Sequence, residues 1–528
     1  MYTSNVRVNK LYKEVSSCDK FVLYGAGHIA RVLVAALDKM KLKPLYCVVT
    51  NMKSNPESVG NVSVYGLSDK VSELCEKNVL VVVAVSDLYE KEIVHILHSK
   101  GINNVALASD YFWNSLGERT FYDIYMEKDF EWYVDRIEEW YLDLHGLRQD
   151  IPDITSEKKV KKGRILFVVN NLSPRVIKIA KALKKCGKEV IIFQDVGMKD
   201  SYWMKFNSSL QEENIANIYY TCIEELIYGL IQNKGEVIHI FSNGWNPYTS
   251  YIVIKFRAYL GKVVFENYDI LNGFYANQDE DKLRLERYCL ENATGVCYRE
   301  FSLEYLTEIL GFQFHGKCLR FFDYCTDSKL VEKTNDKREE LSLCYAGGVE
   351  TGEDWHDCPH GGFIELAEMC EENKWHLHVY PSAWDEKVYA RFIKKDAESR
   401  YFHFHKTVDY DVLVNELSQC DYGIVPTRDD VWEKEISGSY TRYKYIYAGT
   451  NKFFDYLDAG LPIIAGLPLK FVEYLEEKGV LINWTDGQYN FDYLLEMESS
   501  MRKNVMELKE QLSIQKHICE LIDFYESI

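Results

Sequence analysis

Short apolar runs, each followed by a turn and a helical pattern, recur along this chain and constrain its fold more than any other feature. The clearest is LVVVAVS at residues 80–86, which stays apolar over six residues. An unbroken run of this kind is typical of a parallel strand that helices cover on both faces. Comparable runs begin at Phe21, Ile165 and Leu343. Strands that alternate with helices at this spacing predict an α/β fold built from Rossmann-like domains.

The apolar runs fall into three groups, so we expect three Rossmann-like domains. They cover residues 1–115, 163–330 and 331–500, and a polar, charged stretch at 326–340 separates the last two. Residues 116–162 carry no strand pattern and are expected to form a helical linker. Residues 501–528 belong to a long charged helix, expected from about Ser499 to Tyr525, that ends the chain. A length of 528 residues fits this division.

The linker contains one apolar helical stripe. Its residues are spaced by three and four positions, as one face of a helix requires: Phe130, Tyr133, Ile137, Trp140 and Leu144. Such a stripe usually packs on a neighbouring domain, and a dimer interface is the alternative. The oligomeric state is left open.

Charge and cysteine usage exclude several classes of protein. A net charge of −19 argues against a nucleic-acid partner, because phosphate backbones require a basic surface. The 14 cysteines form no CxxC pair, which favours buried thiols in a reducing cytoplasm over disulfides or a zinc site. The N-terminus has no apolar core of a signal peptide, and no stretch of about 18 apolar residues predicts a membrane span. We therefore expect a cytoplasmic protein. Weak peripheral association with the inner face of the membrane, through the basic run at residues 158–162, is the alternative.

Residues 451–466 read NKFFDYLDAGLPIIAG and predict a helix followed at once by a buried strand. Thr450 or Asn451 is expected to cap the helix, since their side chains accept backbone N–H bonds. Gly460 and Pro462 end it. The start of such a helix favours phosphate, and Lys452 adds a full positive charge there.

This segment resembles the donor-binding helix of bacterial glycosyltransferases of the two-Rossmann-domain GT-B architecture, of the glycogen-synthase-like group 1 type. Many of them carry the run N-K-x-F-E/D-Y-x-A-x-G-x-P. The matching residues here are Asn451, Lys452, Phe454, Asp455, Tyr456, Gly460 and Pro462. The resemblance covers residues 163–528. It implies that the last two domains form a GT-B pair, with an acceptor half followed by a donor half.

The resemblance also implies where a nucleotide sugar would bind. The Gly347-Gly348 turn would let backbone amides approach a diphosphate, and Asn451 and Lys452 would meet it at the helix start. Asp455 would accept hydrogen bonds from ribose hydroxyls. Arg428, Arg442 and Lys444 lie in the preceding loop and are candidates to neutralise the leaving nucleotide. Two features depart from the commonest retaining relatives: Tyr447 stands where they carry a first glutamate, and Gly348 where many carry arginine.

On the acceptor side, Asp269 ends a strand at the cleft edge and is the candidate catalytic base. A turn-forming aspartate is the alternative interpretation. Asn171 and Arg175 are candidates for contact with the acceptor. Asp279, Glu280 and Asp281 superficially resemble a metal motif but favour a solvated helix. His403 and His405 share one face of a strand, and without a third ligand they do not predict a metal site.

The N-terminal domain opens with a strand and the turn Gly25-Ala26-Gly27, of the form G-x-G-x-x-A. Glycines in such a turn permit close approach to a phosphate. The second strand ends in Thr50-Asn51, with no acid to hold an NAD ribose. The segment resembles the small N-terminal domain of bacterial sugar acyltransferases, which binds a nucleotide sugar. A structural or assembly domain without a ligand is the alternative.

Together these observations predict a metal-independent glycosyltransferase without a cofactor. It would move a sugar from a nucleotide-diphosphate sugar to a glycan, lipid-linked or other hydroxyl acceptor, in bacterial surface-polysaccharide or related glycan synthesis. Two rivals stay open. One is a non-catalytic nucleotide-sugar-binding or scaffold protein, and the other is a different GT-B chemistry, such as epimerisation or polyol-phosphate transfer.

Overall fold

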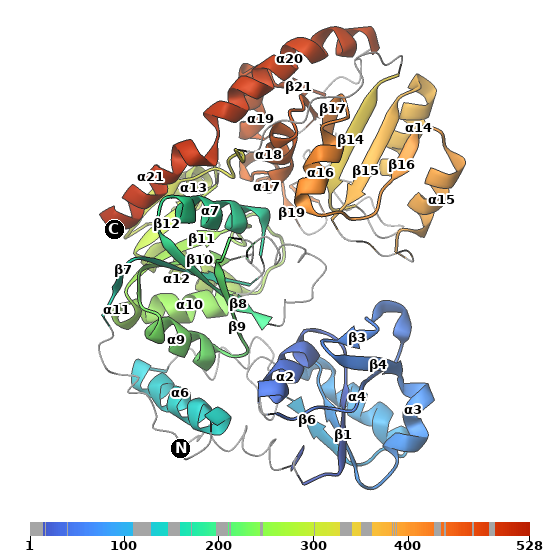
Figure 1. The fold of residues 1–528 in the computed structure, drawn as a ribbon, viewed down its shortest axis with the longest axis vertical. Coiled ribbons are helices and arrows are strands. Elements are labelled where there is room, and N and C mark those ends of the chain that lie inside the picture. The colour runs from blue at the N-terminus through green and yellow to red at the C-terminus, as the bar shows by residue number, and fades with distance from the viewer. Residues whose placement is uncertain are drawn as a thin grey trace.

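The computed structural model describes residues 14–15, 17–39, 41–108, 128–145, 159–170, 172–196, 210, 213–242, 247–299, 301–327, 340–349, 362–382, 384, 386, 388–426, 435–437, 440–466, 469–484 and 491–528. In these ranges the chain forms three sheets of six, seven and six strands and one two-stranded hairpin. Each of the three sheets belongs to one Rossmann-like domain (Figure 1).

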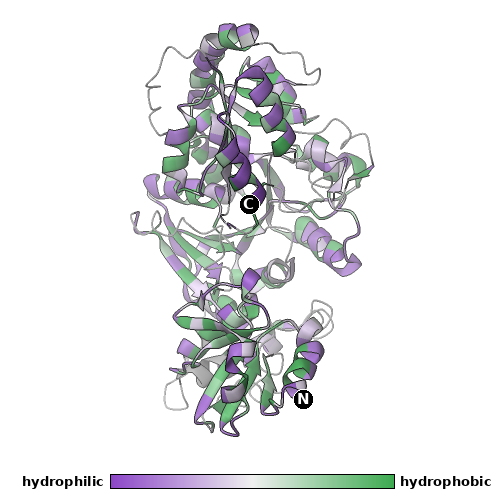
Figure 2. Ribbon diagram, turned by 90° about the vertical axis from the view of Figure 1, so that its right-hand side faces the viewer, coloured by the Kyte–Doolittle hydropathy of each residue, from purple (hydrophilic) through white to green (hydrophobic). Residues whose placement is uncertain are grey.

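The N-terminal sheet has the order β3-β4-β2-β1-β5-β6. Its strands are β1 (Lys20–Tyr24), β2 (Cys47–Val49), β3 (Ser58–Val59), β4 (Val62–Gly66), β5 (Val79–Val83) and β6 (Val105–Leu107). Only β3 is antiparallel to its neighbour. Helices α2 (His28–Lys39), α3 (Leu67–Leu74) and α4 (Asp87–Ser99) connect the strands. Every residue of β5 is buried, as its unbroken apolar run predicted. In Figure 2 these strands, at the bottom of the molecule, are mainly hydrophobic.

The second domain, here called the N lobe, is built on a fully parallel sheet in the order β13-β12-β11-β10-β7-β8-β9. The strands are β7 (Lys161–Val169), β8 (Glu189–Asp195), β9 (Ala216–Tyr220), β10 (Gly235–Ser242), β11 (Lys262–Asn267), β12 (Gly295–Tyr298) and β13 (Lys317–Arg320). Its helices are α7 (Pro174–Lys185), α9 (Ile223–Gln232), α10 (Pro247–Lys255), α11 (Arg257–Leu260), α12 (Glu280–Asn292) and α13 (Ser302–Glu304). Central strands such as β7 and β11 are buried on both faces, as parallel pairing requires.

The third domain, here called the C lobe, has a parallel sheet in the order β16-β15-β14-β17-β20-β21. The strands are β14 (Ser342–Gly347), β15 (His376–Pro381), β16 (Phe402–Phe404), β17 (Tyr422–Val425), β20 (Ile463–Ala465) and β21 (Leu481–Asn483). Helices α14 (Phe363–Asn373), α15 (Ala390–Glu398), α16 (Tyr410–Leu417), α17 (Lys444–Tyr447), α18 (Asn451–Asp458) and α19 (Lys470–Glu477) accompany them. A hairpin of β18 (Ile436–Ser437) and β19 (Tyr440–Thr441) precedes α17.

The linker helix α6 (Phe130–His145) packs on the N lobe, as the apolar stripe predicted. Tyr133 and Ile137 are fully buried, and the Phe130 ring stacks on Tyr259 with ring centroids 3.9 Å apart. The side chains of Trp140 and Leu144 lie outside the described residues.

The chain ends in two helices rather than the single helix expected from Ser499 to Tyr525. Helix α20 (Phe491–Gln511) runs along the C lobe, and α21 (Ile514–Ser527) returns to the N lobe and contacts α7 (Figure 1). The break falls at Ser513, whose hydroxyl accepts a hydrogen bond from the Gln515 N–H and caps α21. A capping serine competes with a continuous helix, which explains the break. Two Rossmann-like lobes, with a C-terminal helix that crosses back, form the predicted GT-B pair.

Within the described ranges, no helix combines the length and the apolar character that a bilayer crossing needs.

Candidate functional site

Helix α18 brings the predicted donor segment to the carboxyl edge of the C-lobe sheet. Phe453, Phe454 and Leu457 are buried beneath it, as their helical spacing predicted. Gly460 has φ of +74°, the left-handed conformation expected after a helix end. The start differs from the prediction, because neither candidate side chain caps the helix. Thr450 holds the N-cap position without a side-chain bond, and the Asn451 side-chain oxygen accepts a hydrogen bond from Arg299 at 2.7 Å.

Two predicted donor residues, about a hundred positions apart in the chain, meet at this edge. Gly347 ends β14 with φ of +151°, and a Cβ there would lie 2.5 Å from Lys452 Cε and 3.2 Å from Nζ. A side chain there would displace the end of the lysine, and the positive φ itself favours glycine. The Tyr345 hydroxyl donates to the Gly348 carbonyl at 2.6 Å, and the space where a Gly348 side chain would lie is open. The structure therefore gathers the glycine turn, the lysine and the start of α18.

Asp455 lies one turn further along α18, partly buried. The Tyr410 hydroxyl donates to Asp455 at 2.9 Å and lies 3.1 Å from Asp458. Burial raises the pKa of Asp455 to about 6, against the influence of the nearby Lys178 ammonium, which lowers it. Lys178 itself lies 2.9 Å from the buried Asp458 carboxylate and links the lobes beneath the site.

Lys444 and Asp269, predicted for opposite sides of the cleft, lie together. The Lys444 ammonium is 3.5 Å from an Asp269 oxygen and donates to the Tyr275 hydroxyl at 2.9 Å. Tyr275 donates in turn to Asp269 at 3.2 Å. Burial lowers the pKa of Lys444, and Asp269 opposes that effect. Arg442 is exposed, with its guanidinium 5.4 Å from the centre of the Tyr443 ring.

The segment that carries these cations crosses from the C lobe to the N lobe. Tyr440 forms an antiparallel bridge with Tyr275, and the Thr441 N–H donates to the Phe274 carbonyl at 3.0 Å. The rings of Tyr443 and Tyr447 lie about 5 Å from Tyr305. Residues 435–437 and 440–447, here called the strap, therefore connect the lobes beside the predicted donor edge.

Glu286, on α12, organises the loop that carries Asp269, and sequence reasoning missed it. Its carboxylate accepts from the N–H groups of Leu271 and Asn272, at 2.7 Å each, and from the side-chain amides of Asn267 and Asn272. Burial raises its pKa to about 7, and these hydrogen bonds limit the rise. Two of these bonds hold the backbone just after Asp269, and the other two hold the side chains of Asn267 and Asn272.

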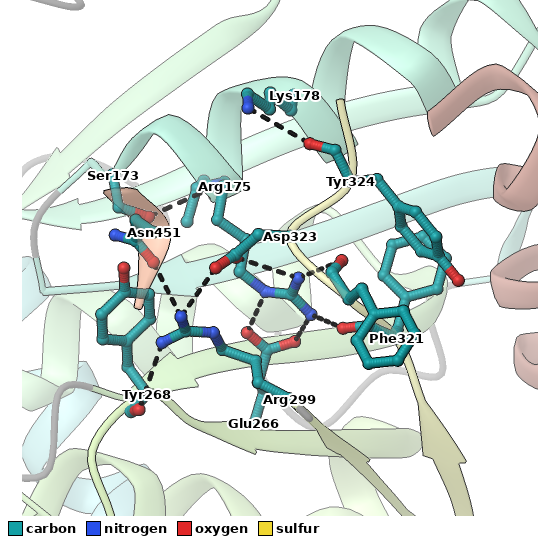
Figure 3. Close-up of polar contacts among 12 residues, drawn as sticks. Ser173, Arg175, Lys178, Glu266, Tyr268, Arg299, Phe321, Asp323, Tyr324 and Asn451 are labelled. Carbon is teal, nitrogen blue, oxygen red and sulfur yellow. Dashed lines mark hydrogen bonds and ion pairs between the residues drawn. The ribbon is translucent and has the colours of Figure 1, made fainter. Parts of the chain in front are cut away.

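Arg175 has a different place from the acceptor surface expected for it. Only 2% of it is exposed, and its guanidinium donates to both oxygens of Glu266, at 2.7 and 2.9 Å (Figure 3). It also donates to the carbonyls of Phe321 and Phe322 and to Asp323. A buried carboxylate at the end of β11 requires a cation, and Arg175 supplies it.

Arg299 extends this buried cluster to the other lobe. One of its nitrogens donates both to Asp323, at 2.6 Å, and to Asn451 at the start of α18 (Figure 3). Its guanidinium also lies 4.1 Å from the centre of the Tyr268 ring. The cluster thus connects the core of the N lobe to the helix that carries Lys452.

Among the described residues, one group of three potential metal ligands lies within 4.8 Å: His239, Glu266 and Cys297. It does not suit a metal ion, because Arg175 already occupies both oxygens of Glu266. The Nδ1 nitrogen of His239 lies 2.6 Å from the Tyr525 hydroxyl of α21.

In the N-terminal domain, the predicted glycine turn follows β1, which pairs with β2 on one side and β5 on the other. Gly25 has φ of +123°, and a Cβ there would lie 2.5 Å from the Ala84 carbonyl oxygen, so the position requires glycine. No atom lies within 4 Å of the place where Gly27 would carry a Cβ. After β2, Thr50 bonds Tyr24 and Asn51 caps a short helix, so both serve the fold. Asn171 and Arg428 lie outside the described residues.

Comparison with known proteins finds similarity in structure only. No protein-family model and no curated protein sequence matches this chain. A pneumococcal O-GlcNAc transferase matches with a TM-score of 0.38 and 10% identity, over 55% of this chain and 56% of its own. A UDP-glucosyltransferase from Polygonum tinctorium matches with a TM-score of 0.41 and 12% identity, over 70% of this chain and all of its own. A putative UDP-N-acetylglucosamine 2-epimerase from Listeria monocytogenes matches with a TM-score of 0.39 and 10% identity, over 65% and 91%. TM-scores and identities this low do not assign a fold by themselves, so the fold assignment rests on the sheets described above.

Proposed function

We propose that this protein transfers a sugar from a nucleotide-diphosphate sugar to a hydroxyl acceptor. The observation that carries the proposal is the position of the Lys452 side chain beside Gly347, in the space where another residue would carry its Cβ. This position favours binding of a diphosphate. It combines a cation, a glycine that keeps the backbone accessible, and the positive end of a helix dipole.

In the proposed reaction, the acceptor oxygen attacks the anomeric carbon of the donor sugar. The bond from that carbon to the phosphate oxygen breaks, and the nucleoside diphosphate leaves with the electron pair. Lys452 and the N–H groups at the start of α18 would neutralise the negative charge that develops on the leaving nucleoside diphosphate. Asp455 would accept hydrogen bonds from the ribose.

The proton of the acceptor hydroxyl must pass to a base. Asp269 is the candidate, because it lies at the carboxyl edge of the N lobe and contacts Lys444 of the strap. A carboxylate at this position can accept the proton as the acceptor oxygen attacks. No protein metal ligand or cofactor enters this scheme. We place the protein in the cytoplasm, in bacterial surface-polysaccharide or related glycan synthesis, because the sequence resembles enzymes of that kind.

The test is incubation with a panel of nucleotide sugars, with and without hydroxyl acceptors. Acceptor-dependent release of a nucleoside diphosphate supports the proposal. A chemically altered sugar on the nucleotide would instead indicate an epimerase. Binding of a nucleotide without turnover would indicate a binding or scaffold protein, and either result overturns the transferase assignment. Proton NMR of the product then gives the stereochemical outcome.

A further inference from the structure

Strands β15 and β16 lie at one edge of the C-lobe sheet (Figure 1). Four partly exposed histidines form a continuous stack on one face of these strands. His376 and His378 alternate along β15, and His403 and His405 come from β16 and the residue after it. The strands are parallel, with His378 directly opposite His403. Alternate residues of a strand share a face, so all four rings lie together. We call these four residues the histidine ladder.

The rings of the ladder interleave between the two strands. Successive ring centroids are 5.2 Å apart for His376 and His403, 4.5 Å for His403 and His378, and 5.3 Å for His378 and His405. The nitrogens meet in two pairs. His376 Nδ1 lies 2.9 Å from His403 Nε2, and His378 Nδ1 lies 3.0 Å from His405 Nε2.

Glu340 determines which nitrogen of His376 can act as a ligand. Its carboxylate lies 2.9 Å from His376 Nε2, so that nitrogen carries the proton and donates it. Nδ1 then accepts the hydrogen bond that His403 Nε2 donates. A metal ion would replace this hydrogen, and the neutral His403 ring would carry its proton on Nδ1 instead. Arg400 holds the Glu340 carboxylate from the other side, at 3.1 and 3.2 Å. A carboxylate that orients the far nitrogen of a histidine is the arrangement most common around protein metal ions.

We propose that the histidine ladder binds a divalent transition-metal ion, with His376 Nδ1 and His403 Nε2 as its primary ligands. Metal–imidazole bonds of about 2.0–2.1 Å with a right angle at the metal place the two nitrogens about 2.9 Å apart. A tetrahedral angle would require about 3.3–3.4 Å. The hydrogen-bonded separation of 2.9 Å needs little change to fit the right angle of tetragonal or octahedral coordination, as Ni²⁺ and Cu²⁺ adopt, and water would complete the site.

The charges around the ladder favour a cation. The carboxylates of Asp396 and Glu416 lie near enough to act electrostatically on the rings of His403 and His405. The metal would join the three-residue edge strand β16 to β15 and so strengthen this edge of the sheet.

The test is calorimetric titration of the full-length protein with NiCl₂ in a non-coordinating buffer, after alkylation of exposed thiols. His403→Gln should abolish the site. Glu340→Gln should weaken it by about 10- to 100-fold, because it removes the group that orients His376. His95→Gln, at an exposed histidine of α4, is the matched control and should bind as the wild type does. Saturating Ni²⁺ should also raise the melting temperature of the wild type but not of His403→Gln.

Melting curves without metal verify that each variant is folded. The proposal is overturned if the wild type binds Ni²⁺ no more tightly than a His376→Gln, His403→Gln double variant. It is also overturned if His403→Gln keeps the wild-type affinity. The test is independent of the proposed glycosyl transfer, since it requires no nucleotide.

Discussion

At the scale of single residues, the candidate site depends on how one lysine is held. The Lys452 side chain extends across Gly347, where any other residue would place a Cβ only 2.5 Å from Lys452 Cε. The absence of a side chain at Gly347 thus leaves space for the lysine beside the start of α18. A cation that is already near the anion's position loses less side-chain entropy on binding.

The first prediction concerns that charge. Lys452→Ala should weaken binding of the preferred nucleoside diphosphate by about 10- to 150-fold, the equivalent of roughly 1.5–3 kcal/mol for a charge-assisted hydrogen bond. Calorimetric titration measures the change. Lys478→Ala, at an exposed lysine of the same lobe, should leave the affinity unchanged. Equal affinities for all three proteins would remove α18 from the donor site.

The second prediction concerns the partly buried Asp455, whose pKa is raised to about 6. An acid with a raised pKa stabilises the folded state below its unfolded pKa near 3.8, and this contribution is lost as the pH rises through 6. Ligand binding should show the opposite trend, because the ionised carboxylate is the better acceptor for ribose hydroxyls. Nucleoside-diphosphate affinity, compared with that of inorganic pyrophosphate, should increase between pH 5 and pH 7.

The pyrophosphate comparison separates the ribose from the titration of the phosphates. In Asp455→Asn the pH-dependent difference between the two ligands should disappear, while pyrophosphate affinity stays near the wild-type value. A difference that persists in the variant would show that Asp455 does not bind the ribose.

At the scale of elements, the four hydrogen bonds to Glu286 define a rigid loop after β11. The third prediction is that Glu286→Ala loosens this loop. The buried N–H group of Leu271 would lose its acceptor, at a cost of about 1–3 kcal/mol, and the partly buried N–H group of Asn272 would lose its acceptor too. The melting temperature should fall, and turnover should fall further than nucleotide affinity, since Asp269 moves and α18 does not. A variant with lower stability but unchanged turnover would exclude a positioning role.

Sequence reasoning predicted most helices and strands but few of the side-chain contacts. The apolar runs predicted most strands of the three sheets, but not β3, β4, β9, β13 and β21. The spacing in residues 451–466 predicted α18, its end at Gly460 and the strand after it, because these features depend on neighbouring residues. The Asn451–Arg299 contact, the burial of Arg175 and the role of Glu286 join residues distant in sequence, so local patterns carry no sign of them. Two of the four ladder histidines were noticed, but the other two become neighbours only through the register of β15 and β16.

At the scale of the whole molecule, the two lobes already touch in several places. Arg299 of the N lobe contacts Asn451, and Lys178 contacts Asp458. Tyr440 in β19 of the strap forms a β-bridge with Tyr275 of the N lobe. Lobes that share a cleft can close around a ligand by rotation about a few connecting residues. Any such rotation must change the contact between Arg299 and Asn451, because this contact joins the two lobes. The contact also lies beside the proposed diphosphate position.

The last prediction therefore concerns this contact. Asn451→Ala removes one hydrogen bond between the lobes, worth about 1.5–3 kcal/mol for a charged donor. Arg299 keeps Asp323, 2.6 Å away, so no buried charge loses its partner and the fold should persist. Small-angle X-ray scattering should give a larger radius of gyration for the unliganded variant than for the wild type. Saturating donor should reduce the radius of both proteins toward one value, because the ligand itself bridges the lobes.

Asn103→Ala, in an exposed turn of the N-terminal domain, controls for the loss of an asparagine and should scatter as the wild type does. Scattering curves that coincide for wild type and Asn451→Ala, with and without donor, would mean that the lobes form one rigid body. The donor would then have to enter a cleft of fixed width, and the strap rather than α18 would determine which nucleotide sugars fit. That outcome leaves the Lys452 prediction intact, since it depends on a charge within the C lobe and not on the motion of either lobe.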